Sequence, residues 1–165
     1  MKTSISEEYL KELEVEAGAT RKCLERIPME LSDWKPHEKS MALGYLALLV
    51  ADIPRWITYI IEKGEIDFAT YDHFHPKNTA ELVNHFEENL SGAKNALKNV
   101  SEDTLSKIFY LKNQGQVLFS SPVKENIGSS INHLVHHRGQ LTVYMRLNNI
   151  PVPSIYGPSA DDKSF

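Results

Sequence analysis

The stretch Asn132-His133-Leu134-Val135-His136-His137-Arg138-Gly139-Gln140-Leu141 lies in the longest periodic segment of this 165-residue chain. His133 and His137 are four residues apart, so on an α-helix both imidazoles lie on one face and are spaced to bind one metal ion. His136 points about 100° away around the helix axis. Alone the pattern is weak, because two exposed histidines at this spacing also arise by chance. A metal site in a helix bundle needs further ligands from a facing helix.

Helical periodicity continues on both sides of this stretch and recurs in three other segments. The segment with the histidines covers about residues 123–148, and the others cover about 6–27, 40–63 and 79–100. In each of them, apolar residues recur at the three- and four-residue spacing of a buried helix face. Four such segments predict an all-α four-helix bundle. The length of the chain suits one domain over residues 1–165.

Local signals mark the ends and connections of these segments. Ser4 with Glu7 is a capping-box pattern at the start of the first segment. Pro54 lies inside the second segment and predicts a kink there. The connection 101–122 is the longest, and its apolar runs flank Asn113-Gln114-Gly115. That arrangement is compatible with a short hairpin or with an extended crossover.

The composition of the chain narrows the classes of function. A formal net charge of -4 without a basic cluster argues against a nucleic-acid partner. Cys23 is the only cysteine, which excludes an internal disulfide and a cysteine-based zinc knuckle. The first residues lack the apolar stretch of an export signal, and the run from Tyr45 to Ala51 is far shorter than the ~20 residues that span a bilayer. We therefore expect a cytoplasmic protein that binds neither nucleic acid nor membrane.

Two separated motifs resemble the DinB/YfiT-like family. One consists of His133 to Leu141 followed by Tyr144, Arg146 and Tyr156-Gly157-Pro158-Ser159, and the other of Lys35 to Met41 followed by Ile53-Pro54-Arg55-Trp56. The similarity extends from Glu7 to Asp162. It implies an up-down-down-up four-helix bundle, often dimeric, which commonly holds one divalent ion between the second and fourth helices. Characterised members of the family include S-transferases that use low-molecular-weight thiols and a thiol-dependent isomerase.

The resemblance assigns the metal ligands of the fourth helix to His133 and His137. The ligand of the second helix would stand five residues before Pro54, where this chain has Leu49. Leucine cannot bind a metal, so we expect a zinc, nickel or iron ion to be weakly bound or absent. Asp52 lies one turn later. It either completes the metal shell or is a solvated or hydrogen-bonded acid near Arg55.

Arg138, directly after the histidine pair, has two interpretations. It anchors the carboxylate of a ligand or thiol cofactor, or it forms an ion pair inside the bundle. Two functions then compete. The first is a metal-assisted transferase or hydrolase with His133 and His137 as ligands. The second is a non-catalytic bundle that has lost the metal and binds a small molecule or a partner, which Leu49 favours. Neither function assigns a catalytic residue, and in both cases we expect a homodimer.

Overall fold

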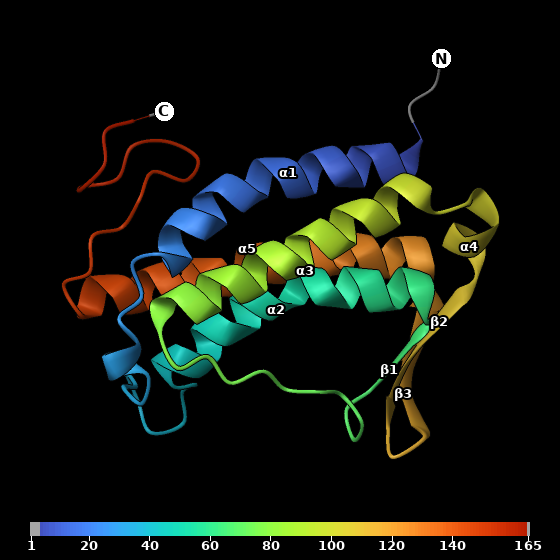
Figure 1. The fold of residues 1–165 in the computed structure, drawn as a ribbon, viewed down its shortest axis with the longest axis horizontal. Helices are drawn as coiled ribbons and strands as arrows, with labels where there is room; N and C mark the ends of the chain where they lie inside the picture. Colours follow the sequence, from blue (N-terminus) through green and yellow to red (C-terminus); the bar gives the residue numbers. More distant parts are fainter. Residues whose placement is uncertain (1–3, 165) are drawn as a thin grey trace.

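The computed structural model describes residues 4–164 and is built around four long helices. They are α1 (Ile5–Leu24), α2 (Leu43–Glu62), α3 (Thr79–Asn99) and α5 (Val123–Leu147). α2 packs against α3 and α5, and α1 packs against the same two helices on the opposite side. Figure 1 shows α2 and α3 running in one direction and α1 and α5 in the other. The four helices therefore follow an up-down-down-up course around a shared core.

The helix ends carry the capping contacts that the sequence predicts. The hydroxyl of Ser4 accepts a hydrogen bond from the backbone N–H of Glu7, and the carboxylate of Glu7 accepts one from the N–H of Ser4. At the start of α3 the side chain of Asn78 accepts a hydrogen bond from the backbone N–H of Glu81, whose carboxylate accepts one from the N–H of Lys77. Gly64 follows α2 with a φ of 69°, a left-handed conformation that glycine adopts without strain. Pro54 lies inside α2, as predicted.

The all-α prediction needs correction, because the structure also contains a three-stranded sheet. Its strands are β1 (Glu65–Asp67), β2 (Ile108–Asn113) and β3 (Gln116–Pro122), in the order β1-β2-β3. β2 and β3 form an antiparallel hairpin, so the hairpin alternative for this connection is correct. Its turn residues Gln114 and Gly115 have φ values of 51° and 78°, as a tight hairpin turn requires.

β1 pairs with β2 as a parallel strand, and Asp67 at the end of β1 forms hydrogen bonds with the turn of the β2–β3 hairpin. The Asp67 carboxylate accepts hydrogen bonds from the backbone N–H groups of Gln114 and Gly115 at 3.0 and 2.7 Å. β1 escaped prediction because three residues are too few for an alternating pattern to be visible. A short α4 (Glu102–Ser106) and a 3-10 turn, η1 (Met29–Leu31), complete the fold.

α2 supplies much of the hydrophobic core. By length and composition alone this helix would be able to cross a membrane, with a mean hydropathy of 1.3. However, 56% of that apolar window is buried inside the bundle, as is typical of the core helix of a globular protein. Cys23 of α1 is also fully buried, and burial raises the pKa of its thiol to about 11. It is therefore a small core residue.

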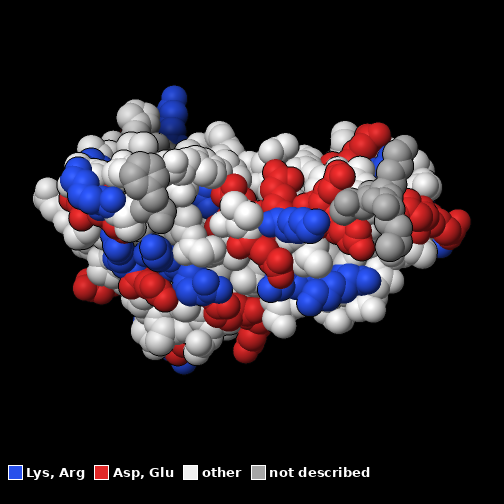
Figure 2. All heavy atoms as spheres, turned by 90° about the horizontal axis from the view of Figure 1, so that it is seen from above, with Lys and Arg blue, Asp and Glu red and all other residues white. Residues whose placement is uncertain are grey.

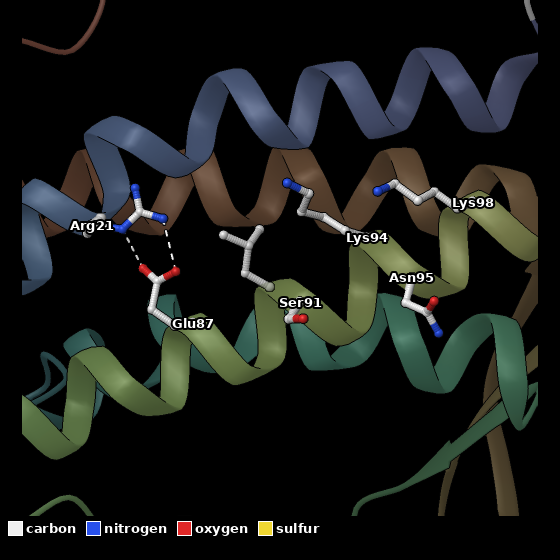
Figure 3. Close-up of a pocket in the computed structure, with 7 residues that line it drawn as sticks. Arg21, Glu87, Ser91, Lys94, Asn95 and Lys98 are labelled. Atoms are coloured by element: carbon white, nitrogen blue, oxygen red, sulfur yellow. Dashed lines mark hydrogen bonds and ion pairs between the residues drawn. The ribbon is translucent and has the colours of Figure 1, made fainter.

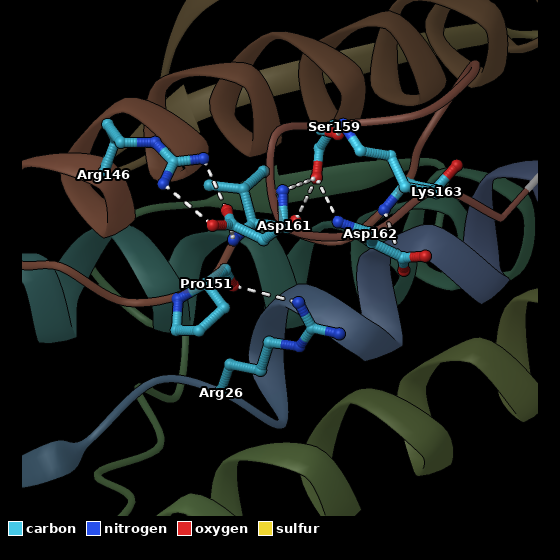
Figure 4. Close-up of polar contacts among 9 residues, drawn as sticks. Arg26, Arg146, Pro151, Ser159, Asp161, Asp162 and Lys163 are labelled. Carbon is cyan, nitrogen blue, oxygen red and sulfur yellow. Dashed lines mark hydrogen bonds and ion pairs between the residues drawn. The ribbon is translucent and has the colours of Figure 1, made fainter.

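The segment after α5 is tied back onto the bundle by polar contacts (Figure 4). Arg146 of α5 forms an ion pair with Asp161, and Arg26 donates a hydrogen bond to the carbonyl oxygen of Pro151 at 3.0 Å. The hydroxyl of Ser159 accepts from the backbone N–H groups of Asp161 and Asp162. Figure 2 shows the face seen from the α1 side, where acidic and basic side chains are interspersed.

Candidate functional site

A cavity of about 330 Å³ lies between α2, α5 and the loop that connects β1 to α3. We call it the histidine cavity. The α2 residues in its wall are three or four positions apart or adjacent, so they form one face of that helix. The wall combines aromatic, aliphatic and titratable side chains: Met41, Tyr45, Leu48, Leu49, Asp52, Trp56, Phe68, Tyr71, His73, Phe74, His133 and His137.

His133 and His137 meet in this wall, as their spacing predicts. Their Nε2 atoms are 2.7 Å apart, and Nδ1 of His137 is 2.8 Å from Oε1 of Gln140. An amide oxygen only accepts, so Nδ1 of His137 carries a proton; with both rings neutral, Nε2 of His133 then donates to Nε2 of His137. Burial, together with the neighbouring His137 and His136, lowers the pKa of His133 to about 4.

Asp52 is the only acidic residue in the wall, and both of its oxygens have partners among the described residues. The hydroxyl of Tyr71 donates to Oδ2 at 2.5 Å, and Nε2 of His85 lies 2.9 Å from Oδ1. Burial alone would raise the pKa of Asp52, but these two contacts and the nearby Arg55 hold it below its usual value. Asp52 is therefore a charged, hydrogen-bonded acid near Arg55, which is one of the two interpretations that the sequence left open.

The same contacts attach the loop to α2. Besides the bond from Tyr71, Arg55 donates a hydrogen bond to the backbone carbonyl of Asp72 at 2.9 Å, and its guanidinium lies 4.8 Å from the centre of the Tyr71 ring. Burial and the Asp52 carboxylate together raise the pKa of Tyr71, so its hydroxyl keeps the proton that it donates. Sequence analysis did not identify Tyr71 or His85. A signal for His85 existed, because it stands on the buried stripe of α3, where a polar group needs a partner.

Arg138 lies outside this cavity. Its guanidinium faces α1 and forms a buried ion pair with Glu16 at 2.6 Å. It also donates to the hydroxyls of Thr20 and Tyr156 at 3.1 and 3.0 Å. The ion-pair interpretation of Arg138 is therefore the one found in the structure. Because Arg138 follows His137 by one residue, the helix turns its side chain by about 100° toward another neighbour.

The donor set of the cavity does not fit the metal site that the resemblance implies. Leu49 lies in the wall with the two histidines, where a third ligand is required. Within residues 4–164, no group of three or more His, Cys, Asp or Glu side chains is arranged to hold a metal ion. The two Nε2 atoms are also directly hydrogen-bonded at 2.7 Å. Two nitrogens on one tetrahedral zinc ion, each at about 2.0–2.1 Å from it, would stand about 3.3 Å apart.

The indole N–H of Trp56 is a buried hydrogen-bond donor in the cavity wall. Its indole Nε1 is buried and forms no hydrogen bond of ordinary geometry among residues 4–164, and the nearby hydroxyl of Tyr71 is already committed to Asp52. Its ring lies 5.3 Å from that of His133, centre to centre. The same two residues also line a smaller cavity of about 160 Å³ next to β2 and β3. Trp56 and His133 therefore separate the two cavities, and a buried donor stands at the partition.

A larger hollow of about 440 Å³ lies on the opposite side of the bundle, between α1 and α3 (Figure 3). Its lining is rich in charge, but the charges are largely paired. Arg21 forms an ion pair with Glu87, and Lys94 lies 2.7 Å from Glu14. The groups are partly exposed to solvent, as in ordinary surface ion pairs. The histidine cavity is therefore the better candidate, because it is more enclosed by apolar side chains and contains the unpartnered donor.

Solved structures of similar fold and one family model match this chain. A DinB-like protein from Bacillus subtilis has 16% sequence identity and a TM-score of 0.69, with 94% of this chain and 99% of that chain covered. A DinB-like protein from Bacillus cereus has 23% identity and a TM-score of 0.69, with 90% and 95% covered. No curated protein sequence matches the chain. The model of the DinB family matches residues 1–164, and the chain therefore belongs to the DinB family.

Proposed function

We propose that this protein is a non-catalytic member of its family that binds a small molecule in the histidine cavity without a tightly held metal ion. The observation that carries the proposal is Leu49, which lines the cavity beside His133 and His137 where a metal ligand is expected. A cavity of about 330 Å³, mostly apolar and with a few polar groups, has the size and character of a small-molecule site.

The polar groups of the cavity support binding better than catalysis. A general base works best with a pKa near the operating pH, and the pKa of about 4 makes His133 a weak base at neutral pH. Asp52 has both oxygens engaged by Tyr71 and His85, so it is not free to accept a proton from a ligand. The thiol of Cys23 is buried in α1, with a raised pKa that disfavours the nucleophilic thiolate.

The competing function is the metal-assisted transferase or hydrolase of the family type, with His133 and His137 as ligands of a degenerate site. Metal titration separates the two functions. We expect the tag-free protein to bind Zn²⁺ or Ni²⁺ weakly and to lose it on dialysis, because two imidazoles are fewer than the three ligands of catalytic zinc sites. One ion per chain retained through dialysis would overturn the metal-free proposal.

Small-molecule binding has its own test, because the chain contains only two tryptophans. Trp34 packs against Tyr144, so Trp34→Phe leaves Trp56 as a single fluorescent reporter in the cavity wall. We expect members of a library of small molecules to change the fluorescence of Trp56 in a saturable manner. In the same background, Leu49→Phe should weaken this binding because the larger ring fills the cavity.

Ile61→Phe is the matched control for Leu49→Phe. Ile61 is a half-buried apolar residue on the same helix, but it does not line the histidine cavity. The control should bind the same compounds as the parent protein. Compounds that bind equally well to Leu49→Phe would locate their site elsewhere and contradict the proposal.

A further inference from the structure

The aromatic content of the histidine cavity is high for its size. Five aromatic residues line it, from α2 and from the loop that covers it: Tyr45, Trp56, Phe68, Tyr71 and Phe74. Aromatic faces carry negative electrostatic potential, so a cation held within about 6 Å of several of them is stabilised. At Tyr71 this position is already taken by Arg55, whose guanidinium lies 4.8 Å from the centre of the ring, so a bound cation would use the other aromatic residues of the wall.

The formal charge of the cavity wall points in the same direction. Among residues 4–164, no lysine or arginine lines the cavity, whereas Asp52 does. Arg55 lies 3.7 Å from Oδ1 of Asp52 and offsets part of its charge. However, its guanidinium donates to Tyr59 and to the Asp72 carbonyl, and Arg55 is not part of the cavity wall. An anion entering the cavity would therefore meet a carboxylate and aromatic faces, with no fixed positive charge in the wall.

The buried N–H of Trp56 adds a second requirement. An unpartnered buried donor destabilises the protein, so a ligand that offers it an acceptor gains affinity. A molecule that interacts with both the aromatic faces and the Trp56 N–H thus has a positively charged group and, near it, a hydroxyl or carbonyl oxygen.

We propose that the ligand of the histidine cavity is a small organic cation, an amine or quaternary ammonium compound that also carries a hydrogen-bond acceptor. This inference rests on the proposed function, since it names the class of molecule that the cavity binds. It also separates this chain from relatives that use low-molecular-weight thiols, because an aromatic wall without lysine or arginine among the described residues favours positive charge.

Four related compounds test the inference in the Trp34→Phe background, with Trp56 fluorescence and calorimetric titration as readouts. Choline has the charged head and a hydroxyl. 3,3-Dimethylbutan-1-ol has the same shape without the charge, 3,3-dimethylbutanoate is its anionic relative, and tetramethylammonium has the charge without the acceptor. We expect choline to bind about tenfold or more tightly than the neutral alcohol, since several aromatic faces contribute together. We expect tetramethylammonium to bind more weakly than choline, and the anion to show no binding.

Tyr45 provides a variant that does not threaten the fold, because its side chain is exposed at the cavity rim. Tyr45→Leu should weaken choline binding about two- to fivefold, the size of one exposed cation–π contact, and leave the neutral alcohol unaffected. Tyr45→Phe keeps the aromatic face and should bind choline as the parent protein does.

The outcomes distinguish the two proposals. If the neutral alcohol or the anion binds as well as choline, and Leu49→Phe weakens that binding, the cavity is a binding site but the cation inference is wrong. If none of the four compounds binds, the cation inference is also wrong. In that case the proposed function stands only if another compound of the library gives a Trp56 response that Leu49→Phe removes.

Discussion

The Nε2 atoms of His133 and His137 lie 2.7 Å apart, close enough for one imidazole to donate a hydrogen bond directly to the other. The two histidines that the family resemblance assigns to a metal ion are thus hydrogen-bonded to each other, and Leu49 lines the same cavity where the resemblance places a third ligand. This arrangement is the physical basis for expecting weak metal binding. It also makes the site easy to test by restoring the absent ligand.

Leu49→His should convert the cavity into a tight metal site for Zn²⁺ or Ni²⁺. A third nitrogen from α2 would complete the three-ligand set of catalytic zinc sites, and the metal would replace the hydrogen bond between His133 and His137. Without metal, the variant should be less stable by about 1–3 kcal/mol, because it adds a polar ring to an apolar wall. Added metal should recover this loss, since it binds the folded state. The regained affinity should fall below pH ~6.5, where imidazoles are protonated.

Calorimetric titration and thermal melting of both proteins measure this effect. Leu48→His is the matched control, because Leu48 lines the same cavity but points about 100° away from Leu49 around the helix axis. It should not create tight binding. Tight binding of one ion by the wild type would mean that Asp52 or a loop histidine supplies the third ligand instead.

Acid should destabilise the protein through His133 between pH ~6.5 and about 4. The pKa of this ring is about 4 in the folded protein and ~6.5 in an unfolded chain, so within this window the unfolded state binds the additional proton. The free energy of unfolding therefore falls as the pH falls, and the loss levels off below about 4. The full shift corresponds to about 3 kcal/mol, and the partial exposure of the ring reduces the expected loss to about 1–2 kcal/mol.

Urea unfolding of the wild type and His133→Asn across this pH range isolates the contribution. His137 contacts the same ring, His136 lies against His137, and Asp52 lies in the same cavity wall, so only the difference between the two proteins is informative. The pKa of Asp52 is held below its usual value, so its own contribution is lost mainly at lower pH. Equal pH slopes for the two proteins would contradict the assignment.

Arg138→Leu should destabilise the protein by about 3–5 kcal/mol, because it leaves the carboxylate of Glu16 buried without its partner. Arg146→Leu removes a more exposed ion pair with Asp161 and should destabilise the protein far less. Chemical denaturation measures both changes. If Arg138→Leu does not fold, Glu16→Gln with Arg138→Met removes both charges together and should be far less damaging.

Ligand binding by the Arg138 variants tests whether Arg138 lies outside the histidine cavity. The folded variants should give the same choline titration as the parent protein in the Trp34→Phe background. A large loss of choline affinity with the fold intact would contradict this placement and would mean that Arg138 takes part in ligand binding.

A homodimer remains our prediction, and the exposed hairpin is its candidate interface. β3 is an edge strand of the sheet, and Val117 and Leu118 are about half exposed on it. The backbone N–H and C=O groups on the outer side of an edge strand have no partner within the sheet, so they can pair with the same strand of a second copy of the chain, and the exposed apolar side chains would be buried there. Light scattering should give a dimer mass at micromolar concentration, and Leu118→Lys should shift it to the monomer. Val143→Lys changes an equally exposed residue on α5 and should stay dimeric. A monomeric wild type would exclude the dimer.

Local geometry explains which features were predictable from the sequence. The cap at Ser4, the four long helices and the meeting of His133 with His137 all depend on residues three or four positions apart. At that distance, the helix itself determines which side chains are neighbours. The resemblance added the position of Leu49 in the wall of the same cavity, because the family motifs align α2 with α5.

Contacts between distant segments were decided only by the tertiary structure. Asp52 has partners 19 and 33 residues away, Tyr71 and His85, and neither lies in a motif that points to Asp52. The periodicity of α5 put Arg138 on another side of the helix from His137, but only packing placed Glu16 of α1 there. β1 likewise exists because a strand from a later part of the chain pairs with it. Periodicity records how one helix or strand faces its surroundings, whereas the identity of the group it meets depends on how the whole chain closes around the core.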